Sequence, residues 1–283
     1  MIEHQTVLVN DVEYFLRVVG TGKEAMILLH GWPETSYAWR HIMKDFISDY
    51  KMLAPDLRGI GDTGKPSGPY DKATVAGDVL AIMDALDIEK AILVGHDIGA
   101  RVAMRMTLDH PERVISLIIL SGRYPPLGDL RISDRSQAME RWYFFFHQHP
   151  DLVEALVAKN VKVYYQHFLD QWSESSFRFE EKDVAEYVRA YSQPGSIRGA
   201  CAHYQAALNE DVSQWVADIG KKIFTPTLVI WGENDPVSPT FYTDDYGQVF
   251  KDLDLHFIPK CGHFPQEEKP VETILAMRSF LKP

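Results

Sequence analysis

Short apolar runs alternate with amphipathic helical patterns in the first third of the chain. The apolar runs predict strands at residues 25–29, 51–54, 91–94 and 115–120. Apolar residues at helical spacing predict helices at residues 73–86 and 98–109, the second of which ends just before a proline. This order of strands and helices is typical of a parallel sheet whose strands are joined by crossover helices.

The last part of the chain repeats this alternation. Its apolar runs predict strands at residues 227–231 and 255–258, and a final helix is predicted at residues 271–281. The same α/β unit therefore begins near the amino terminus, is interrupted, and resumes near residue 223.

The interruption has a different pattern. Between Gly122 and about Lys222 the strand signals vanish, amphipathic helical spacing dominates, and aromatic residues crowd together in runs such as Trp142-Tyr143-Phe144-Phe145-Phe146. We expect a core formed by residues 1–122 and 223–283. We expect residues 123–222, called the lid segment below, to form a helical cap inserted in that core.

A sharp turn is predicted directly after the buried strand at residues 91–94. The segment Gly95-His96-Asp97-Ile98-Gly99 joins this strand to a helix and has small residues on both sides of its centre. A nucleophile elbow needs this context, because the chain turns so sharply that only glycine is tolerated near the reactive residue. We therefore predict that Asp97 is presented above the sheet as a nucleophile.

Asp97 is a carboxylate at a position where the elbow pattern usually has serine. A carboxylate is already ionised at neutral pH, with a typical pKa of about 3.9, and needs no base to become a nucleophile. It can displace a leaving group from saturated carbon and form an alkyl ester, which leaves a base free to activate water. The alternative is that Asp97 only caps the following helix, since aspartate is a favoured N-cap residue.

An acid and a histidine follow the last two predicted strands. Asp235 precedes Pro236 in a loop after the first of these strands, and His263 follows Gly262 in a loop after the second. Open α/β sheets place their chemistry in such loops. We predict that Asp235 holds the imidazole of His263 in the tautomer whose other nitrogen can take a proton from water. The alternative is that both are ordinary loop residues, since aspartate is common in turns.

A candidate oxyanion site follows the predicted strand at residues 25–29. The segment His30-Gly31-Trp32-Pro33 stands where sheets with a nucleophile elbow take one of their oxyanion donors. We predict that the backbone N–H groups of Trp32 and Ile98 bind the oxygen of the tetrahedral intermediate formed when water attacks the ester. His30 is counted among the residues of this site. The alternative is that Pro33 marks a simple turn.

Together these segments resemble one known family, the α/β-hydrolase-fold epoxide hydrolases and their dehalogenase relatives. The resemblance covers nearly the whole chain, and the segments that carry it are 30–33, 56–61, 96–97, the lid segment, Asp235 and 262–263. It implies an α/β-hydrolase fold, with a mostly parallel, doubly wound sheet and an inserted helical cap.

Two tyrosines of the lid segment, Tyr143 and Tyr204, stand where epoxide hydrolases carry a pair that donates hydrogen bonds to the epoxide oxygen. Acid assistance of this kind suits a poor, alkoxide-like leaving group. The resemblance therefore implies that Asp97 opens an epoxide and that a vicinal diol leaves after the ester is hydrolysed. The alternative is that these are two of 13 tyrosines that simply pack in an aromatic lid.

Dehalogenation is the first alternative function that the resemblance leaves open. Fluoroacetate dehalogenases clamp the substrate carboxylate with two arginines, of which only the second is matched here, by Arg101. They bind halide with a His-Trp pair, whose position is close to Trp142, and the histidine is absent here. Haloalkane dehalogenases usually carry tryptophan directly after the nucleophile, where this chain has Ile98. These departures favour the epoxide hydrolase, with Arg101 and Trp142 as candidate substrate-binding residues.

Composition narrows the range of partners. The chain has 29 Lys and Arg against 40 Asp and Glu, a formal net charge of -11, which repels phosphate backbones and anionic lipid. Two cysteines, Cys201 and Cys261, are too few for a disulfide scaffold or a zinc cluster and fit a reducing compartment. The chain starts without a signal-peptide pattern, and no apolar run approaches the ~20 residues that span a bilayer. We expect a cytoplasmic protein that binds neither nucleic acid nor membrane.

The sequence thus predicts a hydrolase that acts on a small molecule and needs no metal or organic cofactor. Relatives often form dimers, so a homodimer is a further expectation. One alternative comes from another class of protein: a catalytically silent binding protein that keeps the pocket and the lid without turnover.

Overall fold

The computed structural model describes residues 2–127 and 135–282. In this part of the chain, one eight-stranded sheet has the order β1-β2-β4-β3-β5-β6-β7-β8. Its strands are β1 (Glu3–Val9), β2 (Val12–Val19), β3 (Ala25–Leu29), β4 (Lys51–Pro55), β5 (Ala91–His96), β6 (Val114–Leu120), β7 (Thr227–Gly232) and β8 (Leu253–Ile258). The β2 strand is antiparallel to both neighbours, and β3 to β8 are parallel. The expectation of a mostly parallel sheet is confirmed.

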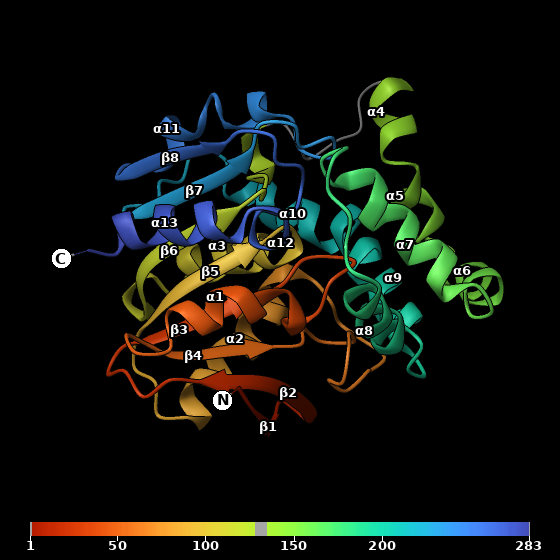
Figure 1. Cartoon of the computed structure of the whole chain (residues 1–283), viewed down its shortest axis with the longest axis horizontal. Coiled ribbons are helices and arrows are strands. Elements are labelled where there is room, and N and C mark those ends of the chain that lie inside the picture. Colours follow the sequence, from red (N-terminus) through yellow and green to blue (C-terminus); the bar gives the residue numbers. More distant parts are fainter. Residues whose placement is uncertain (1, 128–134, 283) are drawn as a thin grey trace.

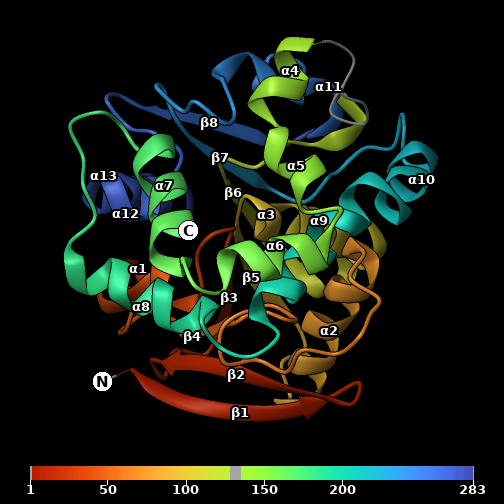
Figure 2. The same cartoon turned by 90° about the vertical axis from the view of Figure 1, so that its right-hand side faces the viewer.

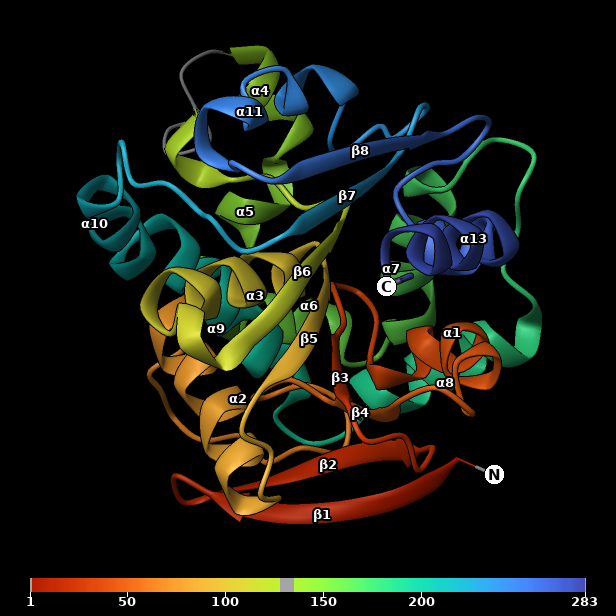
Figure 3. The same ribbon diagram turned by 90° about the vertical axis from the view of Figure 1, so that its left-hand side faces the viewer.

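Helices cover both faces of this sheet (Figures 1 and 3). On one face lie α1 (Arg40–Asp45), α12 (Pro265–Glu268) and α13 (Pro270–Phe280), and on the other lie α2 (Lys72–Ala85) and α3 (Ile98–Asp109). The buried side chains accordingly form two apolar clusters, one that includes α1 and α13 and one that includes α2 and α3. The sheet is therefore doubly wound, as expected. Short helices η4 (Thr240–Thr243) and α11 (Tyr246–Val249) lie between β7 and β8.

The lid segment follows β6 and is helical in its described residues, 123–127 and 135–222, which contain no strand. Its helices are α4 (Arg135–Glu140), α5 (Trp142–Phe146), α6 (Pro150–Val157), α7 (Val161–Trp172), α8 (Glu181–Tyr191), α9 (Ser196–Leu208) and α10 (Glu210–Ala217). Figure 2 looks onto this layer, which lies across the carboxyl end of the parallel strands. The division of the chain into core and cap remains a prediction. The loops that follow β3, β5, β7 and β8 point toward the helices of the lid segment.

The junction between β5 and α3 depends on close contact between backbones. A Cβ atom on Gly99 would lie 2.2 Å from the carbonyl oxygen of Leu29, and one on Gly95 would lie 2.5 Å from the carbonyl oxygen of Gly99. Only glycine fits at such distances, so these two residues let α3 start directly against β3. The tight turn predicted around Asp97 follows from this packing.

Two smaller expectations concern the cysteines and membrane-spanning segments. Cys201 and Cys261 are both buried free thiols. Among the described residues, none of the helices has the length and apolar character needed to cross a membrane.

Candidate active site

Asp97 occupies the sharp turn between β5 and α3 with a φ of +48°. Positive φ is uncommon for any residue other than glycine, and such strain is typical of side chains held for function. The carboxylate makes no capping bond to α3; instead its Oδ1 accepts the backbone N–H of Trp32 at 3.2 Å. The capping alternative is therefore wrong for this side chain, which faces the loop after β3.

His263 lies between two carboxylates. Its Nδ1 is 2.9 Å from Oδ2 of Asp235, and its Nε2 is 3.7 Å from Oδ2 of Asp97. The other oxygen of Asp235 accepts the backbone N–H groups of Val237 and Ser238. Asp235 thus shapes its own turn and orients the imidazole at the same time. Because an ionised carboxylate only accepts hydrogen bonds, Nδ1 carries the proton toward Asp235 and Nε2 faces Asp97.

The charges of this triad shift the titration of its members. Burial alone would raise the pKa of Asp97, but the nearby His263, with smaller contributions from His96 and the backbone N–H of Trp32, holds it well below its usual range. Burial alone would lower the pKa of His263, but Asp235 and Asp97 raise it to about 10. The resting site therefore pairs an ionised Asp97 with a positively charged His263.

The loop after β3 contributes a backbone donor rather than the ring of His30. The Nδ1–H of His30 donates to the carbonyl of Gly31 at 2.8 Å, and its Nε2 accepts the N–H of Leu57 at 2.9 Å. The ring is fully buried and does not line the cavity described below. Counting the ring of His30 among the groups of the oxyanion site was therefore wrong; both of its nitrogens are used to hold the loop that presents the N–H of Trp32.

A second histidine, His96, connects this loop to His263 and was missed by the sequence reasoning. Its Nδ1 lies 2.7 Å from Oε2 of Glu34, and its Nε2 lies 2.8 Å from the carbonyl oxygen of His263. Gln266 donates to both oxygens of Glu34. This buried network fixes the backbone of His263 relative to Asp97. The only sequence signal was position, since His96 directly precedes the nucleophile turn and Glu34 directly follows the oxyanion segment.

The two predicted tyrosines lie beside Asp97 in the lid segment. Tyr143 and Tyr204 are 5% and 4% exposed, their rings are 5.5 Å apart, and both line the cavity that Asp97 lines. Burial, and in smaller part the charge of Asp97, raise the pKa of both hydroxyls above its ordinary value. Both phenols therefore stay protonated at any physiological pH and remain hydrogen-bond donors.

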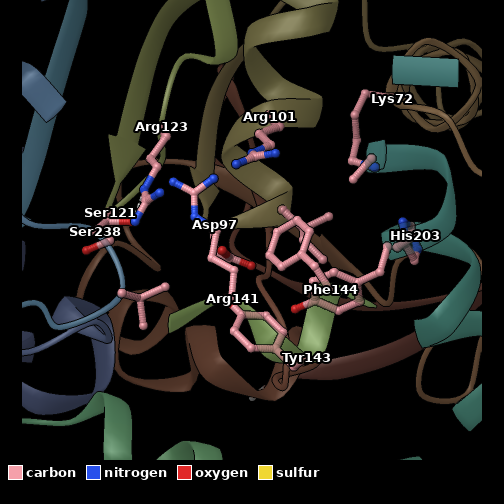
Figure 4. A pocket seen from close by; sticks show the side chains of 14 residues that line it. Lys72, Asp97, Arg101, Ser121, Arg123, Arg141, Tyr143, Phe144, His203 and Ser238 are labelled. Carbon is pink, nitrogen blue, oxygen red and sulfur yellow. Dashed lines mark hydrogen bonds between the residues drawn. The ribbon is translucent and has the colours of Figure 1, made fainter. Parts of the chain in front are cut away.

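Asp97 and the two tyrosines share one cavity (Figure 4). Its lining residues are Lys72, Asp97, Ile98, Arg101, Ser121, Arg123, Arg141, Tyr143, Phe144, His203, Tyr204, Ala207, Val237 and Ser238. Ile98 and Arg101 are among them, and their roles as oxyanion donor and substrate-binding residue stay predictions.

Trp142 does not line this cavity. Its side chain is 43% exposed, and its ring stacks on Phe168 with ring centres 5.8 Å apart. Consecutive side chains on a helix point about 100° apart, so a helix that turns Tyr143 inward turns Trp142 outward. The prediction that Trp142 binds substrate is therefore wrong.

Two cationic residues of the cavity, Arg123 and Arg141, had no sequence signal. Arg123 donates to Oγ of Ser238 at 3.0 Å and lies 3.8 Å from the ring centre of Tyr242, whose hydroxyl accepts from Arg141 at 3.0 Å. They reach the cavity from either end of the stretch that joins β6 to α5, and no spacing in the sequence predicts that meeting.

No group of three or more metal-ligating side chains occurs within the described residues.

Comparison with known proteins gives the same assignment as the geometry. A family model described as the alpha/beta hydrolase fold matches residues 24–270. The chain belongs to the α/β-hydrolase fold family. This α/β hydrolase is 33% identical to a protein named soluble epoxide hydrolase from Corynebacterium sp. (strain C12), over 100% of this chain and 98% of that protein. The expected fold and the expectation of a hydrolase are both confirmed.

Two further relatives of this α/β hydrolase bear on its chemistry. A protein named fluoroacetate dehalogenase from Burkholderia sp. is 30% identical over 99% of this chain and 93% of that protein. The solved structure of the epoxide hydrolase CorEH without ligand superimposes with a TM-score of 0.90 at 33% identity, covering 99% of this chain and 98% of that one.

Proposed function

We propose that this α/β hydrolase is an epoxide hydrolase that converts a small epoxide into a vicinal diol through an ester of Asp97. The observation that carries the proposal is that two protonated phenols, Tyr143 and Tyr204, line the same cavity as an ionised carboxylate. A carboxylate supplies the nucleophile, and the phenols supply the acid that an alkoxide leaving group needs. The names of the Corynebacterium protein and of CorEH support the same reaction.

In the first step, Asp97 attacks the less hindered carbon of the epoxide. A bond forms between a carboxylate oxygen and this carbon, and the bond between the carbon and the ring oxygen breaks. The ring oxygen takes a proton from Tyr143 or Tyr204 while the other hydroxyl donates a hydrogen bond. The product is a hydroxyalkyl ester of Asp97, and the phenolate regains its proton from solvent.

In the second step, water hydrolyses this ester. Once Asp97 is esterified, His263 releases its Nε2 proton to solvent; the neutral Nε2 then takes a proton from water, and the resulting hydroxide attacks the ester carbonyl carbon. The backbone N–H groups of Trp32 and Ile98 hold the oxyanion; the N–H of Trp32 already contacts Asp97, and Ile98 begins α3, where N–H groups have no helical acceptor. When the intermediate collapses, His263 returns the proton to the leaving alkoxide and a diol departs.

The two steps are expected to respond differently to pH. In the resting site, the charge of Asp97 helps to raise the pKa of His263 to about 10. Ester formation removes this charge, so the pKa of His263 falls once the ester has formed. A base acts in its deprotonated form. The rate of ester hydrolysis should therefore rise with pH, reach half of its maximum at a pH below 10, and level off above that pH. Alkylation should stay nearly constant from about pH 5 to about pH 9, because Asp97 is already ionised there. Rapid-quench mass spectrometry of a single turnover measures both rates, and an ester hydrolysis rate that ignores pH would contradict His263 as the base.

The test of the function uses His263→Gln protein mixed with a terminal epoxide or with a haloacetate. If the proposal holds, the variant gains the mass of the epoxide and retains it, since the ester forms but is not hydrolysed. A control variant that also carries Asp97→Asn should gain no mass. A carboxymethyl adduct formed only from the haloacetate would instead support a dehalogenase, which Arg101 in the cavity and the Burkholderia relative favour. The absence of any adduct would support a binding protein.

The remaining features of the proposal concern the setting of the enzyme. The substrate is a small molecule, the chemistry uses side chains without a metal or an organic cofactor, and the enzyme acts in the cytoplasm. Residues 123–222 form the cap over residues 1–122 and 223–283, and the active species is a homodimer, as is common among relatives.

A further inference from the structure

The cavity has a second polar region that the proposed reaction does not use. In Figure 4, Arg123 and Ser238 lie on one side of Asp97, and Lys72 and His203 lie on the other. All of them line the same cavity. A substrate that reacts at Asp97 can therefore extend toward Lys72 and His203, which belong to the start of α2 and to α9.

His203 presents an unused hydrogen-bond acceptor. Its side chain is 1% exposed, and its Nε2 lies 2.9 Å from the carbonyl oxygen of Arg58, so Nε2 carries the proton. Burial and the nearby charge of Lys72 lower the pKa of His203 to about 3, which keeps the ring neutral. Nδ1 is then a lone-pair acceptor, and it makes no hydrogen bond within the described part of the chain.

Lys72 brings a second polar group to the same cavity. Its side chain is 1% exposed, and its Nζ forms an ion pair with Oδ2 of Asp211 at 3.0 Å. The backbone N–H of Lys72 donates to the other oxygen of Asp211 at 2.7 Å. An ammonium group has three N–H donors, and among the described residues Nζ has no partner besides Asp211. Its N–H groups are therefore available to an acceptor that enters the cavity.

Buried polar atoms nearly always have a hydrogen-bond partner, so the unpartnered Nδ1 of His203, a residue that lines the cavity together with Lys72, indicates a bound polar group. A hydroxyl matches these two residues, because it can donate to Nδ1 of His203 and accept from Nζ of Lys72 at once. A carboxylate would meet the lone pair of His203 and the charge of Asp211, which both repel it. An alkyl end would leave both polar atoms unsatisfied.

We propose that Lys72 and His203 form a subsite for a substrate hydroxyl, so that the preferred substrates are epoxides with a neutral hydroxyl at the end away from the ring. This inference rests on the proposed epoxide hydrolase activity. Asp211 is a positioning residue, since it holds Lys72 by ion pair and backbone contact without lining the cavity.

The test compares straight-chain 1,2-epoxides that end in a primary hydroxyl with epoxides of equal length that end in methyl, at several chain lengths. For the best length, kcat/KM should be higher by about tenfold or more for the hydroxyl, since a site built to bind a hydroxyl discriminates against analogues that lack it. The double variant Lys72→Met/Asp211→Asn replaces the ion pair by neutral groups of similar size. It should lose this preference, so that the ratio of kcat/KM for the two kinds of epoxide falls to about one. Lys44→Met, the same change at an exposed site on α1, should keep the preference.

The possible failures can be told apart. If both kinds of epoxide are hydrolysed equally well at every length, the hydroxyl subsite is wrong and the proposed function stands. If neither is hydrolysed, the proposed function fails, and the subsite is then judged by titration calorimetry with the matching diols. Tighter binding of the diol with the extra terminal hydroxyl, lost in the double variant, would still support the subsite; equal binding would overturn it.

Discussion

Asp97→Asn protein is expected to lose epoxide hydrolysis by about 10⁴-fold or more. The amide cannot act as a nucleophile toward the epoxide carbon, so the ester never forms and neither its hydrolysis nor the release of the diol can follow. Asparagine is the most conservative replacement here, because it tolerates the positive φ at position 97 and its amide oxygen can still accept the N–H of Trp32. The measurement is kcat/KM for a terminal epoxide, with intact-protein mass to show that no ester accumulates.

Two controls make this result specific to the nucleophile. The thermal midpoint of Asp97→Asn should stay close to that of the unchanged protein, since Asp235 remains as the partner of His263. Mass spectrometry must also show that the new amide has not hydrolysed back to aspartate. A variant that keeps more than about 1% of the activity would mean that Asp97 is not the attacking group.

The elements that position Asp97 were predictable from sequence because they are buried on both faces. Strands such as β3 and β5 are fully buried, and parallel strands of this kind read as continuous apolar runs. The predicted bounds of β3 and α3 agree with the structure. The turn between β5 and α3 was predictable for a related reason, since only glycine allows the backbone contacts made by Gly95 and Gly99.

Exposed strands gave weaker signals. Most of β1 is exposed, and this strand pairs only with β2. It therefore shows no apolar run, and the pattern of apolar residues predicted no strand there. At the other edge of the sheet, β8 was predicted only from residue 255, although it begins at Leu253, because its middle residues are exposed. At both edges, pairing with a neighbouring backbone decides the structure more than side-chain burial does.

The cavity was only partly predictable, for a different physical reason. Helical spacing shows which residues share a face but not which faces of distant helices meet. Lys72 and His203 lie far apart in sequence, on α2 and α9, yet both line one cavity. Trp142 and Tyr143 show the same limit, since two adjacent aromatic residues differ only in helical phase, and tertiary packing decides which one faces Asp97.

Replacing both lid tyrosines, Tyr143→Phe with Tyr204→Phe, is expected to lower kcat/KM for an epoxide by about 10³-fold, the usual scale of general acid catalysis. Phenylalanine keeps the ring contacts that place these side chains, including the stacking of Tyr143 on Trp32 and of Tyr204 on His147. The loss therefore reports the two hydroxyls rather than the packing of the lid segment. Each single variant should lose less, because the remaining hydroxyl can still donate.

The step that slows identifies what the tyrosines do. Without their hydroxyls the ring oxygen leaves as an unassisted alkoxide, so single-turnover alkylation of Asp97 should fall. Hydrolysis of any ester that does form should continue at its usual rate, because it depends on His263 and on backbone N–H groups. Trp142→Phe is the matched control: it changes an aromatic residue on the same helix that faces away from the cavity, and should leave both rates within about threefold. Slower ester hydrolysis with unchanged alkylation in the double variant would mean that the tyrosines position the water or His263, and that another group protonates the leaving oxygen.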